Sequence, residues 1–484
     1  MNILFIASEA VPFAKTGGLA DVAGILPQVM ASSETVSLII PEYNTENIRD
    51  RELKIIDSFS VQIGSRSFHA SIKKAYISPR FTAYFVAQDS FFAREFLYGD
   101  SCGDYPDNFL RFFFFQKAIV EFIRRGKISF DIIHCHDWQA ALIPLFIKLP
   151  ATPPFLQKSK IVFSIHNLGY QGIFNGNYFK ETGFPEYLFS PDYLEFYGNI
   201  NFMKAGIIFS DWLLTVSPTY AKEILLSENG FGLDGLLNKF SFKLSGILNG
   251  ADYSQWNPET DPFIDHPYSW RDLEIKSMNK KTLYQELHIA KNRRAPLLIM
   301  IARISEQKGM RVLLDLLPIL LREDLHFIFL GRGDSFWTEK LHEAAAQFPE
   351  NLTFLNRFDE RMAHRLEAAA DIFFMPSMYE PCGLNQIYSM KYGTVPVVRA
   401  TGGLEDSVEE FQADSGRGTG FKFSCNQALE IMPLIRKALT LYQDKNTWRR
   451  VQQNGMKLDF SWENVVREYL KLYNKISGED NNHG

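Results

Sequence analysis

The sequence predicts an α/β protein with two Rossmann-like, doubly wound domains. Three observations predict this fold class: short apolar runs typical of buried strands, helical stretches between those runs, and a restart of the pattern near residue 297. Strands that alternate with helices form right-handed βαβ units around a parallel sheet. A chain of 484 residues also exceeds the usual size of one hydrophobic core, so two or three domains are expected.

Ten short apolar runs are the candidate strands. In each run, the side chains that would point to either face of a strand are mostly apolar. This pattern is typical of strands buried on both faces of a parallel sheet. Five lie in each half of the chain: residues 3–7, 37–40, 131–135, 161–165 and 212–216, then 297–302, 326–330, 352–355, 371–375 and 395–398.

Helical spacing of apolar residues marks the stretches between the runs. Residues 19–30 carry one apolar face, and Pro27 inside them is expected to kink or shorten that helix. Residues 360–370 show the same spacing, and residues 461–476 form the last predicted helix, with Ser461 as its N-cap. The apolar stripe of this last helix is Trp462, Val465, Val466, Tyr469, Tyr473 and Ile476.

An irregular stretch separates the two patterns, and we place a hinge within residues 245–258. The predicted domains are residues 1–247 and 248–457, followed by a segment 458–484 that holds the last helix. Its polar end, residues 478–484, is expected to be disordered.

Composition excludes several classes of protein. The net charge is −5 and no basic block stands out, which argues against a nucleic-acid-binding surface. The four cysteines, Cys102, Cys135, Cys382 and Cys425, form no C-x-x-C pair, so neither a disulfide framework nor a structural zinc site is expected. The first residues lack the charge of a signal peptide, and no apolar run reaches membrane-spanning length. We therefore expect a cytoplasmic protein without a membrane partner.

The first motif is Lys15-Thr16-Gly17-Gly18, between the first strand and a helix that contains Asp21. Glycines let the backbone approach a ligand, and a helix N-terminus favours an anion. Taken alone, the motif is better explained as a glycine turn with a solvated lysine. It matches neither the dinucleotide fingerprint nor the P-loop.

Two cations follow the first strand of the second domain. Arg303 and Lys308 lie five residues apart, and a diphosphate suits a forked guanidinium together with an ammonium. A salt-bridged loop is the alternative, but the carboxyl ends of strands are where such sheets bind ligands.

Glu380-Pro381-Cys382-Gly383-Leu384 follows a later strand and precedes a helix. The carboxylate of Glu380 can accept hydrogen bonds from sugar hydroxyls, and the neighbouring backbone N–H groups can hold a phosphate. The alternative is an acid that complements the helix dipole. Cys382 has no evident His–Asp partner, so a small, partly buried thiol is favoured over a nucleophile.

Two first-domain loops combine polar and aromatic residues. His134 and His136 could indicate a metal, but a sugar-lining loop is favoured because Asp137 binds hydroxyls and Trp138 offers a flat apolar face. The second loop begins at His166. The chain has no D-x-D tripeptide for a metal-held diphosphate, so neither a metal nor another cofactor is expected.

In this order the motifs resemble the bacterial glycogen synthase and plant starch synthase family over nearly the whole chain. The segments that carry the resemblance are residues 15–21, 136–138, 166–172, 216–220, 246–250, 303–309, 380–384 and 391–404.

The resemblance implies the GT-B fold: two Rossmann-like domains that face each other across a cleft, with the C-terminal helix crossing back to the first. It implies an acceptor side in the first domain and a donor side in the second. The implied activity is retaining transfer of glucose from ADP-glucose to the non-reducing 4-hydroxyl of an α-1,4-glucan. The partners are then a nucleotide-sugar donor and a glucan acceptor.

The resemblance also assigns residues. Catalysis is assigned to Lys15, His166, Arg303, Lys308 and Glu380. Donor binding is assigned to Lys15, Gly18, Asp21, Asn249, Arg303, Lys308, Phe358, Glu380, Cys382, Gly383 and Leu384. Acceptor binding is assigned to Tyr98, Asp137 and Trp138. The stretch before Tyr98 departs from the family pattern, as does the short segment 28–36.

Two other readings stay open at this point. One is a retaining GT-B transferase with a different donor or acceptor, although Tyr388, where some relatives carry a second glutamate, favours the glycogen and starch synthases. The other is a non-catalytic glucan-binding protein. Because Glu380 is assigned to hydroxyl binding, no carboxylate nucleophile is evident, and we expect front-face departure and attack.

Overall fold

The computed structural model describes residues 1–478 except 101, 102, 151, 291 and 293, so Cys102 and the predicted tail beyond residue 478 lie outside it. The chain forms two compact units. The first comprises Met1–Val216, Ala221–Ile247 and Trp462–Gly484, and the second Ser217–Tyr220 and Leu248–Ser461. The predicted C-terminal segment begins at residue 458, whereas the first unit resumes at Trp462. Residues 217–220, which were predicted in the first domain, belong to the second unit.

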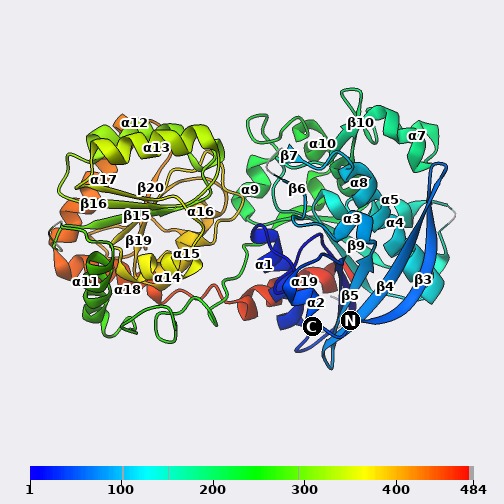
Figure 1. The fold of residues 1–484 in the computed structure, drawn as a ribbon, viewed down its shortest axis with the longest axis horizontal. Coiled ribbons are helices and arrows are strands. Elements are labelled where there is room, and N and C mark those ends of the chain that lie inside the picture. Colours follow the sequence, from blue (N-terminus) through cyan, green and yellow to red (C-terminus); the bar gives the residue numbers. More distant parts are fainter. Residues whose placement is uncertain (101–102, 151, 291, 293, 479–484) are drawn as a thin grey trace. The chain divides into compact units, whose positions relative to one another are not determined.

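A nine-stranded sheet forms the centre of the first unit (Figure 1). Seven neighbouring strands are parallel, and the last two form an antiparallel hairpin at one edge. The order is β14 (Leu244–Gly246), β13 (Trp212–Thr215), β9 (Lys160–Ile165), β8 (Ile132–His136), β1 (Asn2–Ile6), β2 (Thr35–Pro41), β5 (Phe81–Ala87), β4 (Arg66–Ser78), β3 (Lys54–Ile63). All five predicted strands are confirmed. Strands β14, β5, β4 and β3 were missed, and the half-exposed strands of the hairpin lack a continuous apolar run.

Helices of the first unit cover this sheet. Helix α1 (Gly18–Met30) continues past Pro27, so the expectation of a shortened helix is wrong. The carbonyl of Pro27 accepts a 3.0 Å bond from Ala31 N, and Pro27 and Met30 are both buried. The other helices are α2 (Glu46–Arg49), α3 (Asp89–Phe92), α4 (Asn108–Gly126), α5 (Ile143–Lys148), α6 (Pro154–Gln157), α7 (Phe179–Thr182), α8 (Phe202–Phe209) and α10 (Asp234–Lys239).

Two small sheets complete the first unit. One has the order β10 (Ile173–Asn175), β12 (Asn199–Asn201), β11 (Glu195–Phe196), and the other pairs β6 (Gly99–Asp100) with β7 (Gly103–Asp104).

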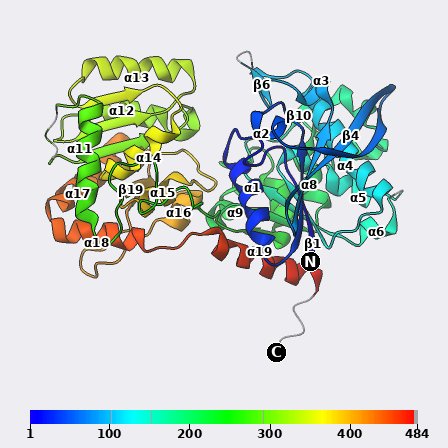
Figure 2. The same ribbon diagram turned by 60° about the horizontal axis from the view of Figure 1, so that its bottom comes forward.

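The last helix, α19 (Trp462–Ser477), belongs to the first unit and lies beside α1 (Figure 2). The predicted apolar stripe is buried except for Ile476, which is half-buried. The hydroxyl of Tyr473 lies 2.7 Å from Nδ1 of the buried His134 on β8. The predicted return of the C-terminal helix is therefore correct.

The second unit has one sheet of six parallel strands. Its order is β17 (Leu352–Leu355), β16 (His326–Leu330), β15 (Leu297–Ile301), β18 (Ile372–Met375), β19 (Val395–Arg399), β20 (Phe421–Phe423). All five predicted strands are confirmed, and β20 was missed. Helix α14 (Glu360–Ala369) matches the predicted helix.

Two hydrophobic cores lie on the two faces of this sheet. Leu298 and Met300 of β15 belong to one core, while Leu297 and Ile299 belong to the other. This alternation explains why the strand is apolar at every position. The remaining helices are α11 (Lys276–Glu286), α12 (Met310–Leu320), α13 (Ser335–Gln347), α15 (Asn385–Lys391), α16 (Gly402–Ser407), α17 (Ala428–Gln443), α18 (Lys445–Met456) and α9 (Pro218–Glu223), which spans the boundary of the units.

The strand order has a switch point in each sheet. In the first unit β1 lies between β2 and β8, and in the second β15 lies between β16 and β18. Chain connections leave these central strands in opposite directions, which opens a crevice at the carboxyl ends of the strands. The Lys15 and Arg303 loops follow these two central strands directly.

Candidate active site

In the second unit, the ammonium of Lys308 binds the carboxylate of Glu380. Their side chains are 16% and 7% exposed, and Ser377 Oγ donates a 3.0 Å hydrogen bond to the same carboxylate. The alternative reading of Glu380, as an acid complementing the dipole of α15, does not describe this geometry, because its charge is compensated by a lysine from another loop. The two motifs that follow β15 and β18 therefore form one site.

Backbone contacts hold these two loops together. Met378 N donates to Gln307 O over 2.7 Å, and Gln307 Nε2 donates to Tyr379 O over 3.3 Å. Gly309 has φ +76, and a Cβ there would lie 2.0 Å from Pro376 O, so only glycine permits this approach. The contacts fix the position of Lys308 relative to Glu380.

The loop after β19 supports Glu380 from its backbone side. Gly403 N donates a 3.1 Å bond to Glu380 O, and a Cβ on Gly402 would lie 2.0 Å from that same oxygen. Gly402 also has φ +45. Gly402 is therefore required by the close approach of Glu380, and Gly403 by that of Cys382, whose carbonyl oxygen would lie 2.0 Å from a Cβ there.

Cys382 is buried, and burial raises the pKa of its thiol to about 12. The thiol accepts a hydrogen bond from the backbone of Asn249, which is also buried. A protonated thiol is a poor nucleophile, in agreement with the structural role expected for Cys382. This hydrogen bond brings two of the predicted donor residues, Asn249 and Cys382, together.

Two predicted donor residues of the second unit are exposed. Arg303 forms no ion pair with any residue that the structure describes, so its guanidinium is available to an anion. The side chain of Phe358 is 85% exposed after β17. Among the described residues, no hydrogen bond or ion pair joins either residue to the Lys308–Glu380 pair.

In the first unit, the Lys15 loop is held by a residue that the sequence analysis missed. Glu9 is 4% exposed, and its carboxylate accepts bonds from the backbone and hydroxyl of Thr16 and a 3.4 Å bond from Gly17 N. Burial raises the pKa of Glu9 to about 6, although these hydrogen bonds oppose the shift. An acid three residues after the central strand was the signal in the sequence.

The surface above this loop is open. A Cβ placed on Gly17 or Gly18 would meet no atom within 4 Å. Lys15 is half exposed and pairs with Asp21 at 2.7 Å. The protein itself does not require these glycines for packing, so their lack of side chains leaves room for a ligand.

The predicted histidine and aspartate of the first unit lie together. Asp137 Oδ1 accepts a 2.8 Å bond from His166 N, and His166 Nε2 lies 2.9 Å from Nδ1 of His136. Burial lowers the pKa of His166 to about 3, so its imidazole is neutral at pH 7. Burial raises the pKa of Asp137 to about 7 despite the backbone hydrogen bonds.

The other predicted acceptor residues are positioned by aromatic packing. Trp138 packs edge-on against Phe112 at 4.9 Å and Phe174 at 5.5 Å. Tyr98 is half-buried, and its hydroxyl lies 2.7 Å from Ser8 Oγ. Tyr98 also forms a side-chain hydrogen bond with Glu9, the residue that holds the Lys15 loop.

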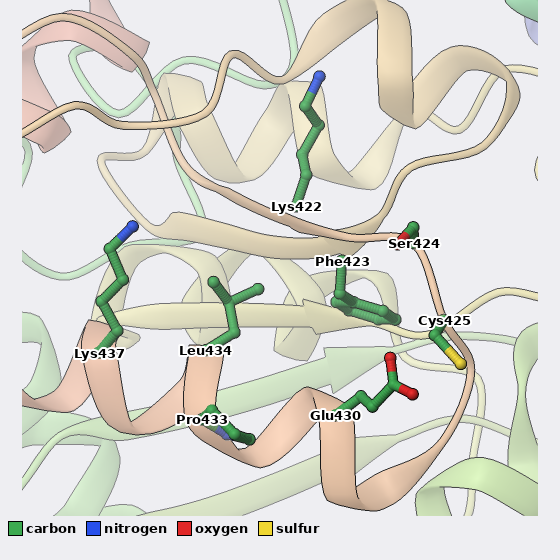
Figure 3. A pocket seen from close by; sticks show the side chains of 8 residues that line it. All are labelled: Lys422, Phe423, Ser424, Cys425, Glu430, Pro433, Leu434 and Lys437. Atoms are coloured by element: carbon green, nitrogen blue, oxygen red, sulfur yellow. The ribbon is translucent and has the colours of Figure 1, made fainter.

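A hollow of about 380 Å³ in the second unit contains none of the predicted site residues (Figure 3). Two of its lining lysines are already paired, Lys422 with Glu405 at 2.8 Å and Lys437 with Glu410 at 3.2 Å. The hollow therefore lacks free cations for a diphosphate.

Among the described residues, no cluster of His, Cys, Asp and Glu is arranged to hold a metal ion, and no helix has the length and apolarity to cross a bilayer.

Comparison with known structures first gives the class of protein. The chain superposes on the catalytic domain of starch synthase IV from Arabidopsis thaliana, bound to ADP and acarbose, with a TM-score of 0.89, 33% identity and 99% coverage of each chain. A sucrose-phosphate synthase from Thermosynechococcus elongatus shares the fold at 17% identity and a TM-score of 0.61. The chain is a GT-B glycosyltransferase, which confirms the predicted fold class.

Comparison of sequences gives the family. Residues 2–239 match the family described as "Starch synthase catalytic domain", and residues 285–457 match "Glycosyl transferases group 1". The chain is 41% identical over 477 residues to the glycogen synthase of Koribacter versatilis, covering 98% of both chains, and 40% identical over 476 residues to glycogen synthase 2 of Geobacter sulfurreducens, also covering 98% of both. It belongs to the glycogen and starch synthase family.

Proposed function

We propose that the protein transfers glucose from ADP-glucose to the 4-hydroxyl at the non-reducing end of an α-1,4-glucan, with retention of configuration. The observation that carries the proposal is the Lys308–Glu380 pair at the switch point of the second sheet, in a chain of this family. The ADP in the related starch synthase structure supports an adenine nucleotide as the donor.

Each predicted residue has a role that its surroundings support. We assign the donor diphosphate to Arg303 and Lys308, because one is an exposed guanidinium and the other an ammonium held beside the sugar-binding acid. Glu380, the amides of residues 382–384 and Asn249 are assigned to the transferred glucose. Phe358 is assigned to the nucleotide base, since its ring is free to stack.

Residues of the first unit are assigned on the same basis. Lys15, Gly18 and Asp21 are proposed as further donor ligands, because the open space above the glycines admits a phosphate. Neutral His166 is proposed to contact the glucose at the reacting centre. Asp137, Trp138 and Tyr98 are proposed for the acceptor.

The reaction breaks the bond between glucose C1 and the diphosphate oxygen and forms a bond from C1 to the acceptor O4. The proton of the acceptor hydroxyl passes to the leaving diphosphate on the same face of the sugar. Arg303 and Lys308 stabilise the negative charge that develops on the diphosphate, which is an electrostatic contribution to catalysis. No metal ion is required in this proposal.

A parallel assay tests the function. Radiolabelled ADP-glucose and UDP-glucose are incubated separately with glycogen, and incorporation into polymer is counted. Faster incorporation from ADP-glucose supports the proposal, and faster incorporation from UDP-glucose refutes the donor assignment. Donor binding without incorporation from either nucleotide would favour a non-catalytic glucan-binding protein.

A cytoplasmic location is proposed because Cys135, Cys382 and Cys425 are free thiols.

A further inference from the structure

Two turns of the first unit hold aromatic residues in left-handed backbone. Tyr197 has φ +49 and precedes Gly198 at φ +80, and Phe231 has φ +49 and precedes Gly232 at φ +79. Bulky residues rarely adopt this conformation, and such strained residues concentrate at functional sites. Burial does not compensate the strain, since Tyr197 is 82% exposed and Phe231 is 37% exposed.

The two turns pack against each other. The rings of Phe196 and Tyr197 lie edge to face with centroids 4.7 Å apart. A Cβ on Gly232 would lie 3.0 Å from Phe196 Cζ and 3.8 Å from Tyr197 Cε2. Phe196 and Tyr197 therefore lie beside the turn that carries Phe231, and we call these three aromatic residues the aromatic platform.

One loop connects the platform to the predicted acceptor residues. Gln171 is 6% exposed; its Nε2 donates a 3.0 Å bond to Phe231 O, and its Oε1 accepts a 2.7 Å bond from Asn201. The next residue, Gly172, packs so closely on Trp138 that a Cβ would lie 2.6 Å from Trp138 Cε3. The segment that begins at His166 thus contacts Trp138 and holds the platform.

Polar groups lie next to the Tyr197–Gly198 turn. Gly198 lines a hollow of about 390 Å³ together with Asn175, Gly176, Asn177, Phe179, Lys180 and Phe189. Asn175, Asn177 and Lys180 are exposed, and no described residue forms an ion pair with Lys180. The surface therefore offers flat rings beside amide and ammonium donors.

We propose that the aromatic platform binds the α-glucan acceptor chain at glucose residues beyond the one being elongated. The inference rests on the proposed function and extends it to the length of acceptor that the enzyme prefers. Rings with exposed faces bind the apolar faces of glucose, while donors nearby bind its hydroxyls. Because the Gln171 loop holds the aromatic platform and also contacts Trp138, the platform suits a glucan chain that continues from Trp138.

The test compares a long with a short acceptor. Variants Tyr197→Ala, Phe231→Ala and the double variant are assayed with glycogen and with maltose, and the ratio of the two kcat/KM values is measured. Each single change is expected to lower the ratio of glycogen to maltose about fivefold, since one ring contact is lost. Tyr76→Ala, which removes a 77% exposed tyrosine from β4, is the matched control and is expected to leave the ratio unchanged.

A second variant separates ring loss from misfolding. Tyr197→Gly removes the ring and suits φ +49, so it is expected to fold and to lower the ratio as Tyr197→Ala does. An unchanged ratio in the double variant, or an equal fall with both acceptors, would overturn the platform. If the wild-type protein transfers no glucose, the proposed function fails. The platform is then tested by binding alone, in native gels that contain glycogen. Equal migration of the double variant and the wild-type protein would overturn the platform.

Discussion

Lys308 and Glu380, 72 residues apart in the chain, form an ion pair at the carboxyl ends of two neighbouring strands. Removing one member of a buried pair leaves the other charge uncompensated and costs about 3–5 kcal/mol. Lys308→Ala should therefore lower both activity and thermal stability. Activity should fall about 100-fold or more, because the charge that stabilises the leaving diphosphate is lost.

The double variant Lys308→Ala/Glu380→Gln separates these two effects. It removes the charge left by Lys308→Ala, so thermal denaturation should show a higher Tm than in the single variant, while activity stays low. A lower Tm in the double variant would show that the two groups are not coupled. Lys340→Ala, which breaks an exposed pair with Glu343, serves as a control that leaves both quantities near wild type.

Glu9→Ala should weaken donor use without contacting the donor. The change leaves Thr16 and Gly17 without their buried acceptor, so the Lys15 loop loses its support. We expect KM for ADP-glucose to rise about tenfold, and Glu9→Gln, which keeps one acceptor oxygen, to have a smaller effect. Donor titrations at saturating glycogen measure this, with Glu121→Ala, which breaks a pair with Arg124 within helix α4, as a control. Equal KM values in Glu9→Ala and wild type would contradict this role.

Two glycines should respond in opposite ways to alanine. Gly402→Ala meets Glu380 O at 2.0 Å and adopts φ +45, so it should lower Tm strongly. Gly17 has extended backbone, φ −153, and open space around its Cβ position. Gly17→Ala should therefore keep the wild-type Tm and raise KM for the donor. A loss of stability in Gly17→Ala would contradict the inferred open space.

Asp137 predicts a pH dependence of stability. Because burial raises the pKa of Asp137 from its ordinary value of 3.8 to about 7, the folded protein binds the proton more tightly than the unfolded chain. The stability that this group contributes is present below pH 3.8 and is lost as pH rises to about 7. Asp137→Asn should therefore raise Tm at pH 8 relative to wild type and lower activity. A Tm difference that is the same at pH 5 and pH 8 would contradict the assignment.

Chelation tests the proposal that no metal is required. Arg303 and Lys308 supply the positive charge that a divalent ion would otherwise provide. Transfer from ADP-glucose in the presence of EDTA should stay within about twofold of the untreated rate. A loss of activity restored by added magnesium would show that these two cations do not suffice.

The sequence predicted ten strands because each contains a short apolar run. Nine of them are mostly buried, and β17, at the edge of its sheet, is largely half-buried. It could not predict the β3–β4 hairpin, whose residues such as Ile55 and Tyr76 are exposed. Among site residues, the motif at Glu380 was found, but its ion pair with Lys308 depends on which strands are neighbours. Glu9 was missed because its role depends on the turn that brings Thr16 back to it.

The position of α19 has a consequence for biosynthesis. In the first unit, Tyr473 of α19 supplies the hydroxyl that contacts the buried His134 of β8. Helix α19 is translated only after the whole second unit. The second unit is nearly continuous in the chain, so its sheet can form on the ribosome while the first unit still awaits its last helix. Termination of translation before residue 462 would therefore leave the earlier-made unit incomplete, although every strand of its sheet had already been synthesised.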